Sequence, residues 1–332
     1  MPDHTIPDRA DPTVAFIVPH KGRTDMLAQT LRSVFEQNTA LTWQICVATQ
    51  EPDLSLTALG VPQDAQVRLL HAPASLTISE LRNLGLEQSR SEFVVFLDAD
   101  VQLSPNWLEA MYALLTNNPD YAIVSAIQAN SQDAPVLERI RTALSNAKTD
   151  AEVDFLPGRN LFMRRVTVET IGGFPPHLVT CEDYYFTDQA RRQGRLFYSS
   201  QASYIHLGED KAFWPMFKKE IWRGQSNFQS VRGRYISWRE IPSFIMPLLI
   251  PAGLLILLIG VWAGFLGLSV AGAGIVLLPP LLYSLRLKIT TGKDLPLTEL
   301  VKFYLLYFPA RAYGTIRGLF APITHSGSSR LA

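Results

Sequence analysis

Charged side chains are missing from one long stretch of the chain, because residues Ile241 to Leu285 include no Asp, Glu, Lys or Arg. This stretch has room for two membrane spans of about 20 residues each, and Gly264 and Gly267 lie near its middle, where a turn would fall. The alternative is a long buried hairpin in a soluble protein. Because a soluble helix of this length needs a polar face, the sequence predicts two transmembrane helices within residues 241–286.

Cysteine is scarce, since Cys46 and Cys181 are the only two in 332 residues. So few cysteines do not suggest a disulfide framework. Cys46 lies in a predicted buried strand, where a thiol behaves as a small apolar side chain. Acidic residues adjoin Cys181, and we expect them to raise the pKa of its thiol. We therefore expect both cysteines to be reduced, as in the cytoplasm.

Net charge and an apolar leader are also lacking. The 30 Lys and Arg residues balance the 30 Asp and Glu residues without forming a long basic stripe, which argues against nucleic acid as a partner. Residues 1–13 are polar and contain no apolar core, so they exclude an ordinary secretory signal.

Basic residues flank the charge-free stretch on both sides. They are Arg223, Arg232, Arg234 and Arg239 before it, and Arg286, Lys288 and Lys293 after it. The positive-inside rule places both flanks in the cytoplasm. We therefore expect a multi-pass protein of the cytoplasmic (inner) membrane whose N-terminal domain faces the cytoplasm.

Short apolar runs alternate with helical patterns over residues 13–210. They predict strands at residues 14–18, 43–48, 67–70, 93–97, 121–127, 158–163 and 195–198, and helices at 25–37, 79–89, 104–116 and 182–193. We expect Ser104 to cap the third helix. The alternation is typical of an α/β domain with a doubly wound, mostly parallel sheet. The polar segment 128–154 breaks it and predicts an insertion with a helix at 136–144 that covers the site.

The segments outside the α/β domain and the charge-free stretch differ from both in composition. We expect a flexible N-terminus over residues 1–12. Residues 211–240 mix aromatic with basic side chains, which suits amphipathic helices in the membrane interface; a helix packed on the α/β domain is the alternative. Residues 287–332 form an amphipathic C-terminal segment, and charged residues interrupt its part at 298–320 too often for a third span.

Two aspartates directly follow the apolar run Phe93–Leu97. Asp98 and Asp100 would lie at the carboxyl end of a buried strand, where ligands gather in open α/β sheets. Two carboxylates there can hold Mg²⁺ or Mn²⁺ against a diphosphate. The alternative is that the pair caps the helix that begins near Pro105. The motif favours an enzyme that uses a nucleotide-diphosphate substrate.

Four stretches within residues 13–230 together resemble the membrane-anchored family 2 glycosyltransferases, which have the GT-A fold. They are Val14–Pro19 with Leu31–Val34 and Gln37; Leu81–Gly85 with Phe96–Asp100; Gly158–Arg165 with Ile171–Phe174; and Cys181–Asp183 with Arg192, Gly194 and His206. Each motif is weak alone, and their order and spacing make the match specific.

The resemblance implies an inverting transfer of a sugar from a nucleotide-diphosphate donor, UDP- or GDP-linked. The acceptor would be lipid-linked or a polysaccharide at the cytoplasmic membrane face, and membrane lipid would be a further partner. Mg²⁺ or Mn²⁺ would be held by Asp98 and Asp100. His206 resembles a third metal ligand, although a lone histidine is more often structural.

The resemblance also implies roles on the acceptor and donor sides. Asp183 would be the general base, with Glu182 beside it; the alternative is that both are acids favoured by a helix N-terminus. Donor-binding residues would be Pro19, Thr49, Glu51, Arg82, Asp98 and Arg223. Arg82 would lie near the nucleotide phosphates or be a surface helix charge, and Arg223 would contact a phosphate or a lipid headgroup.

One stretch departs from the family. After its second strand the family has paired acidic residues, of which the first contacts the base, whereas this chain has Ala48-Thr49-Gln50-Glu51. Thr49 can donate a hydrogen bond to a base but supplies no carboxylate, and Glu51 is the substitute at hand. This departure favours the alternative of a non-catalytic partner in a glycan assembly complex, which the Asp98, Asp100 and Asp183 set opposes.

Two further alternatives stay open. A polyprenyl-phosphate sugar synthase also has a GT-A domain before two spans, but the pattern over residues 158–183 fits that group less well. A nucleotidyltransferase would use the same metal chemistry with a Gly-rich phosphate loop, of which Lys21-Gly22-Arg23 is a thin version.

Overall fold

The computed structural model describes residues 11–225, 227, 241–291 and 295–320. Its strands are β1 (Val14–His20), β2 (Trp43–Thr49), β3 (Val67–His71), β4 (Phe93–Leu97), β5 (Val101–Leu103), β6 (Tyr121–Ala129), β7 (Ala151–Val153), β8 (Asn160–Arg164) and β9 (Arg195–His206). Its helices are α1 (Thr24–Phe35), α2 (Ile78–Glu87), α3 (Trp107–Asn117), α4 (Val136–Ser145), α5 (Arg165–Ile171), α6 (Glu182–Ala190), α7 (Phe213–Gly224), α8 (Ile241–Trp262), α9 (Leu266–Thr291) and α10 (Leu297–Phe320).

The strands form one mixed sheet in the order β3-β2-β1-β4-β8-β6-β9-β5, with β7 paired to β9. The first four strands in this order are all parallel. β8 runs antiparallel between β4 and β6, and β6 pairs with β9 in parallel. The carboxyl ends of β1, β2 and β4 therefore lie at one edge of the sheet, where the predicted site residues follow them.

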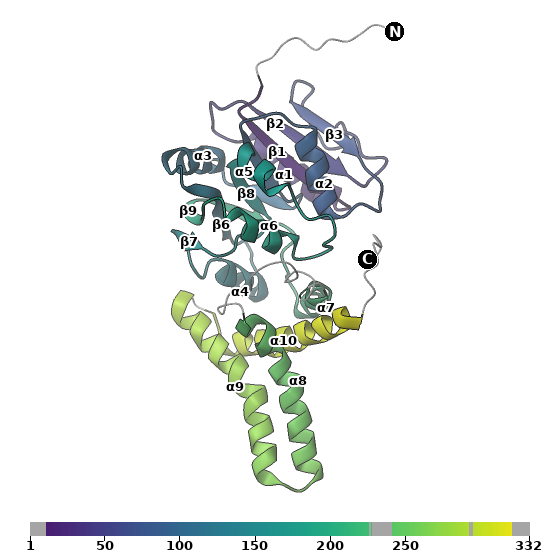
Figure 1. Ribbon diagram of the computed structural model, residues 1–332, viewed down its shortest axis with the longest axis vertical. Helices are drawn as coiled ribbons and strands as arrows, with labels where there is room; N and C mark the ends of the chain where they lie inside the picture. The colour runs from purple at the N-terminus through teal and green to yellow at the C-terminus, as the bar shows by residue number, and fades with distance from the viewer. Residues whose placement is uncertain (1–10, 226, 228–240, 292–294, 321–332) are drawn as a thin grey trace.

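Helices cover both faces of the sheet and complete the predicted three-layer α/β fold (Figure 1). Leu27 and Leu31 of α1 pack with Trp107 of α3 on one face. Val168 of α5 and Phe186 of α6 pack on the other. Every residue of β1 and β4 is buried, as expected for parallel strands covered on both sides.

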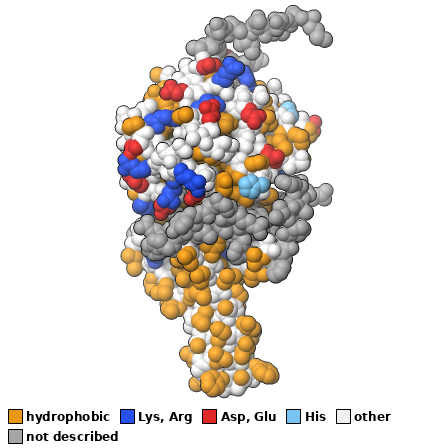
Figure 2. Space-filling model, in the orientation of Figure 1, with side chains coloured by type: hydrophobic (Ala, Val, Ile, Leu, Met, Phe, Trp, Pro, Cys, Tyr) orange, Lys and Arg blue, Asp and Glu red, His pale blue; other side chains and the backbone are white. Residues whose placement is uncertain are grey.

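The C-terminal helices form a separate layer below the α/β domain, with α8 and α9 projecting from it as a hairpin (Figure 1). α8 and α9 are long and apolar enough to cross a membrane, and only 22% and 17% of their most apolar segments are buried. Figure 2 shows apolar side chains covering the hairpin, while charges gather on the α/β domain. α10 lies across the base of the domain and is packed against α4, α8 and α9 by Leu300 and Phe303.

Several boundaries differ from the prediction, and β7 and α5 were not predicted. α3 begins at Trp107 with Asn106 as its N-cap, because Ser104 donates its hydroxyl to Asn106 and lies at the end of β5. β9 continues to His206 because it pairs with β5 and β7 as well as β6, and β5 itself was not predicted. The tail at residues 1–10 and the aromatic and basic residues predicted as interfacial at 228–240 lie outside the described residues.

Candidate active site

Asp100 and His206 face each other at the carboxyl edge of the sheet. β4 ends at Leu97, and β5 then pairs antiparallel with β9 so that Val101 is opposite His206. This register brings Nε2 of His206 to 3.4 Å from Oδ2 of Asp100. Residues 106 positions apart in the sequence thus meet because a three-residue strand ties the Asp-x-Asp segment to β9.

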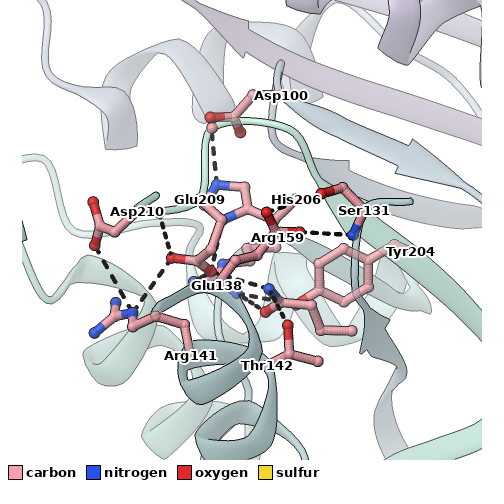
Figure 3. Close-up of polar contacts among 12 residues, drawn as sticks. Asp100, Ser131, Glu138, Arg141, Thr142, Arg159, Tyr204, His206, Glu209 and Asp210 are labelled. Carbon is pink, nitrogen blue, oxygen red and sulfur yellow. Dashed lines mark hydrogen bonds and ion pairs between the residues drawn. The ribbon is translucent and has the colours of Figure 1, made fainter. Parts of the chain in front are cut away.

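The other ring nitrogen of His206 also contacts a carboxylate. Its Nδ1 lies 3.1 Å from Oε2 of Glu209 (Figure 3). Burial and the charge of Arg159 would lower the pKa of His206, but Asp100 and Glu209 outweigh them and raise it. A carboxylate that accepts a hydrogen bond from the second ring nitrogen is a usual partner of a metal-binding histidine.

Asp100 has a second cationic neighbour. Arg23, between β1 and α1, places its guanidinium 3.0 Å from Oδ2 of Asp100 while 55% of its side chain is exposed. Burial opposes ionisation of Asp100, yet His206 and Arg23 lower its pKa to about 2. A Cβ at Gly208 would overlap the side-chain ends of both Asp100 and Arg23, so any other residue there would displace this pair. Asp100 is therefore ionised and paired with Arg23 and His206.

Arg82 joins the two acidic parts of the site. Its side chain is only 1% exposed, and it donates to Oδ1 of Asp98 at 2.8 Å and to Oε1 of Glu182 at 2.9 Å. The alternative of a surface helix charge is therefore wrong. Burial raises the pKa of Asp98 even though Arg82 opposes this. Asp98 is oriented toward Arg82, which leaves Asp100 and His206 as the pair best placed for a cation.

Glu182 and Asp183 begin helix α6. The preceding Cys181 has a left-handed backbone, with φ of 63°. Asp183 accepts hydrogen bonds from the backbone N–H groups of Gly158 at 3.1 Å and Tyr184 at 2.8 Å. Burial and the Asp183 charge raise the pKa of Glu182 to about 7, against the effect of Arg82. Both acids lie at the N-terminus of α6, as the alternative interpretation predicted. This position also fixes the Asp183 carboxylate at the candidate site.

The cysteines conform to the sequence analysis. Cys46 and Cys181 are both free, Cys46 within β2. Burial, with Asp183 nearby, raises the pKa of the Cys181 thiol to about 11, so this thiol is protonated at neutral pH.

In the predicted base-binding segment, residues 48–51, the side chains of Thr49 and Glu51 form hydrogen bonds within the protein. Thr49 is buried, and its Oγ1 lies 2.9 Å from Nδ1 of His20, the residue after Pro19 in β1. Glu51 accepts a hydrogen bond from the backbone N–H of Gly22 at 2.8 Å. Thr49 therefore orients His20, and Glu51 is the carboxylate held at this edge of the sheet.

Arg223 is engaged by carboxylates within the protein. It lies 2.5 Å from Glu220 and 3.4 Å from Asp210. These carboxylates and Glu209 form a buried cluster with Arg141, Arg159, Lys219 and Arg311. Sequence reasoning did not identify this cluster. Its one signal was the Glu209-Asp210 pair, which begins three positions after His206.

The donor set at this site fits a hard divalent ion that shares its coordination with a substrate. In the described part of the chain, no three His, Cys, Asp or Glu side chains form a ready-made metal cage. Asp100 and His206 supply one carboxylate and one imidazole. Mg²⁺ and Mn²⁺ sites of this kind are completed by water and substrate phosphates.

Known proteins similar to this chain are glycosyltransferases. Residues 15–172 match the model of glycosyl transferase family 2. Glycosyltransferase AglE of Haloferax volcanii is 28% identical over 185 residues, 52% of this chain and 57% of that protein. An uncharacterized glycosyltransferase of Haemophilus influenzae is 24% identical over 226 residues, 64% of this chain and 86% of that protein. The chain thus spans little more than half the length of the Haloferax relative.

A solved structure shares the fold. The mannosyltransferase PcManGT from Pyrobaculum calidifontis, in complex with GDP-Man and Mn²⁺, matches with a TM-score of 0.60 at 14% identity. The match covers 94% of this chain and 88% of that one. The sheet order, the family match and this similarity agree: residues 15–172 match glycosyl transferase family 2, and the α/β domain that they form most of has the GT-A fold.

Proposed function

We propose that this glycosyltransferase transfers a sugar, with inversion, from a nucleotide-diphosphate donor to a lipid-linked or polysaccharide acceptor at the cytoplasmic membrane face. The observation that carries the proposal is the meeting of Asp100 and His206 at the carboxyl edge of the sheet, 3.4 Å apart. The family match supports a nucleotide-sugar donor. The similar mannosyltransferase holds GDP-Man and Mn²⁺, which supports a GDP-linked sugar as the first donor to test.

Asp100 and His206 would hold Mg²⁺ or Mn²⁺. When bound, the ion neutralises charge on the departing diphosphate. Glu209 keeps the Nε2 of His206 directed at Asp100. Arg82 fixes the orientation of the Asp98 carboxylate. These contacts fix the orientation of His206 and Asp98 before the donor arrives.

Asp183 would accept the proton of the attacking acceptor hydroxyl. Two backbone N–H groups fix its carboxylate, and Glu182 beside it is held by Arg82. One arginine thereby sets the spacing between the donor-side carboxylate Asp98 and the start of α6. A general base needs this kind of fixed placement near the reacting hydroxyl.

The hairpin of α8 and α9 would span the membrane, with α10 at its surface. The charge-free sequence and the exposed apolar side chains of both helices support this. Reporters fused to the two ends of the chain should both report the cytoplasm. Reporters on opposite sides would contradict a two-span anchor.

Donor binding tests the proposal before an acceptor is known. Thermal unfolding of the purified full-length protein should be followed with UDP- and GDP-linked sugars, each with Mn²⁺ or EDTA. We expect one nucleotide class to stabilise the protein only with Mn²⁺, and Asp100→Ala to abolish this stabilisation. Equal stabilisation in EDTA would contradict the metal assignment, and no response to any nucleotide-sugar would favour the non-catalytic alternative.

A further inference from the structure

A series of buried ion pairs runs from helix α10 to the candidate metal site. At its outer end, Nε of Arg311 lies 2.7 Å from Oε2 of Glu220 on α7. Arg141 of α4 then lies 3.1 Å from Glu220 and 3.3 Å from Glu209. Glu209 contacts Nδ1 of His206 at 3.1 Å, and Figure 3 shows the part from Arg141 to His206. We call this series the ion-pair chain.

The carboxylates of the ion-pair chain are removed from water. The side chains of Glu209 and Glu220 are 1% and 0% exposed. Burial opposes their ionisation, but the neighbouring cations lower the pKa of each, that of Glu220 to about 2. Charges in such an environment interact strongly and keep their partners. When one charged side chain of the ion-pair chain moves, we therefore expect the side chain paired with it to move as well.

Helix α10 is held closely against α7. A Cβ at Gly314 would overlap the carbonyl oxygen of Ile221, and one at Gly318 would overlap that of Gln225. The backbones of the two helices are therefore in direct contact where Arg311 meets Glu220. The position of α10 relative to α7 is fixed, and Arg311 cannot shift without the ion pair shifting too.

We propose that Arg311 is a positioning residue for the metal site, acting through the ion-pair chain on the orientation of His206. The inference rests on the proposed function, because it requires a metal at Asp100 and His206. It gives α10 a part in sugar transfer although α10 lies outside the α/β domain, beside the candidate membrane spans (Figure 1).

The affinity for Mn²⁺ alone tests this inference without an acceptor or donor. Full-length protein in detergent should be titrated with Mn²⁺, and free ion measured by electron paramagnetic resonance. Glu209→Gln should weaken binding about 10- to 100-fold, the usual effect of losing a partner of a metal ligand. Arg311→Met should weaken it about 2- to 30-fold, the range for coupling through a contact network. Arg311→Lys should restore much of the loss.

The double variant decides whether Arg311 acts through Glu209. Once Glu209→Gln has interrupted the ion-pair chain, adding Arg311→Met should change Mn²⁺ affinity by less than about twofold. Arg317→Met, an exposed arginine on the same helix, is the matched control and should bind like wild type. Glu220 keeps Arg141 and Arg223 as partners, so Arg311→Met should fold, and thermal unfolding of the same samples verifies this.

The outcomes separate this inference from the proposed function. Loss of Mn²⁺ binding in Asp100→Ala supports the metal site by itself. If that loss is seen but Arg311→Met binds like wild type, or the two effects add fully in the double variant, the positioning role is refuted and the proposed function stands. A wild-type protein that binds no Mn²⁺ in this titration would refute the positioning role, and the donor-binding experiment would then decide the proposed function by itself.

Discussion

Arg82 contacts Asp98 and Glu182 at once, at 2.8 and 2.9 Å, with a side chain that is almost completely buried. One planar guanidinium therefore joins the end of β4 to the start of α6. Its other face lies over the ring of Phe174, with Cζ 4.6 Å from the ring centroid. A single side chain thus holds together the proposed donor and acceptor sides of the site.

Replacing Arg82 should damage both stability and activity. Arg82→Met leaves the buried Glu182 and the partly exposed Asp98 without their cation, and breaking a buried pair typically costs about 3–5 kcal/mol. Arg82→Lys should restore only part of this loss, because an ammonium group lacks the guanidinium's fork of donors. Urea unfolding in detergent measures the effect, with Arg32→Met at an exposed site on α1 as the control. Equal stability of Arg82→Met and wild type would refute the bridging role.

Arg23 should compete with a metal ion for Asp100. It occupies Oδ2 of Asp100 from a partly exposed position, where an ion pair is worth up to about 1 kcal/mol. Arg23→Ala should therefore tighten Mn²⁺ binding in the absence of donor, by about two- to fivefold. Donor affinity in saturating Mn²⁺ should fall, because a cation near the diphosphate is lost. Calorimetric titrations measure both constants, and a loss of Mn²⁺ affinity in the variant would contradict competition.

Glu182 should make stability depend on pH. Burial and Asp183 raise its pKa in the folded protein to about 7 from an ordinary 4.5. Between these values the native state holds a proton that the unfolded chain releases, so the free energy of unfolding decreases as pH rises through this window. The limiting slope for one group is about 1.4 kcal/mol per pH unit.

The comparison with Glu182→Gln isolates this contribution. Urea unfolding at pH 5 and pH 7 should show wild type losing stability relative to Glu182→Gln as pH rises. Glu169→Gln, at an exposed position on α5, should follow wild type. A difference between wild type and Glu182→Gln that stays constant with pH would show that Glu182 is ionised throughout.

Much of the fold was predictable because the sheet is buried on both faces. β1, β2 and β4 are mostly apolar and almost wholly buried, and helix α1 has apolar residues at helical spacing. Asp98 and Asp100 could be located because they follow such a run directly. β5 was missed because three residues are too few to establish an alternation, and without β5 the contact of His206 with Asp100 could not be derived from the strand pattern.

The pairing of charges was the least predictable part of the site. Arg82 and Glu182 are separated by 100 positions, and nothing local indicates that Arg82 on α2 is buried. Glu220 lies on the amphipathic α7, where an acid is expected to face water, but Arg141 and Arg311 from other helices surround it. Such partners are set by helix packing and not by local sequence.

The role of Asp183 tests the account's central claim most directly. Asp183→Asn keeps the shape of the side chain and an oxygen that can accept a hydrogen bond from Gly158, but it cannot take a proton. Loss of a general base typically lowers the rate by about 10²–10⁴-fold. Donor binding with Mn²⁺ and sugar transfer should be measured on one preparation of this variant. We predict near-normal donor binding with transfer reduced by that factor; transfer at the wild-type rate would contradict the account.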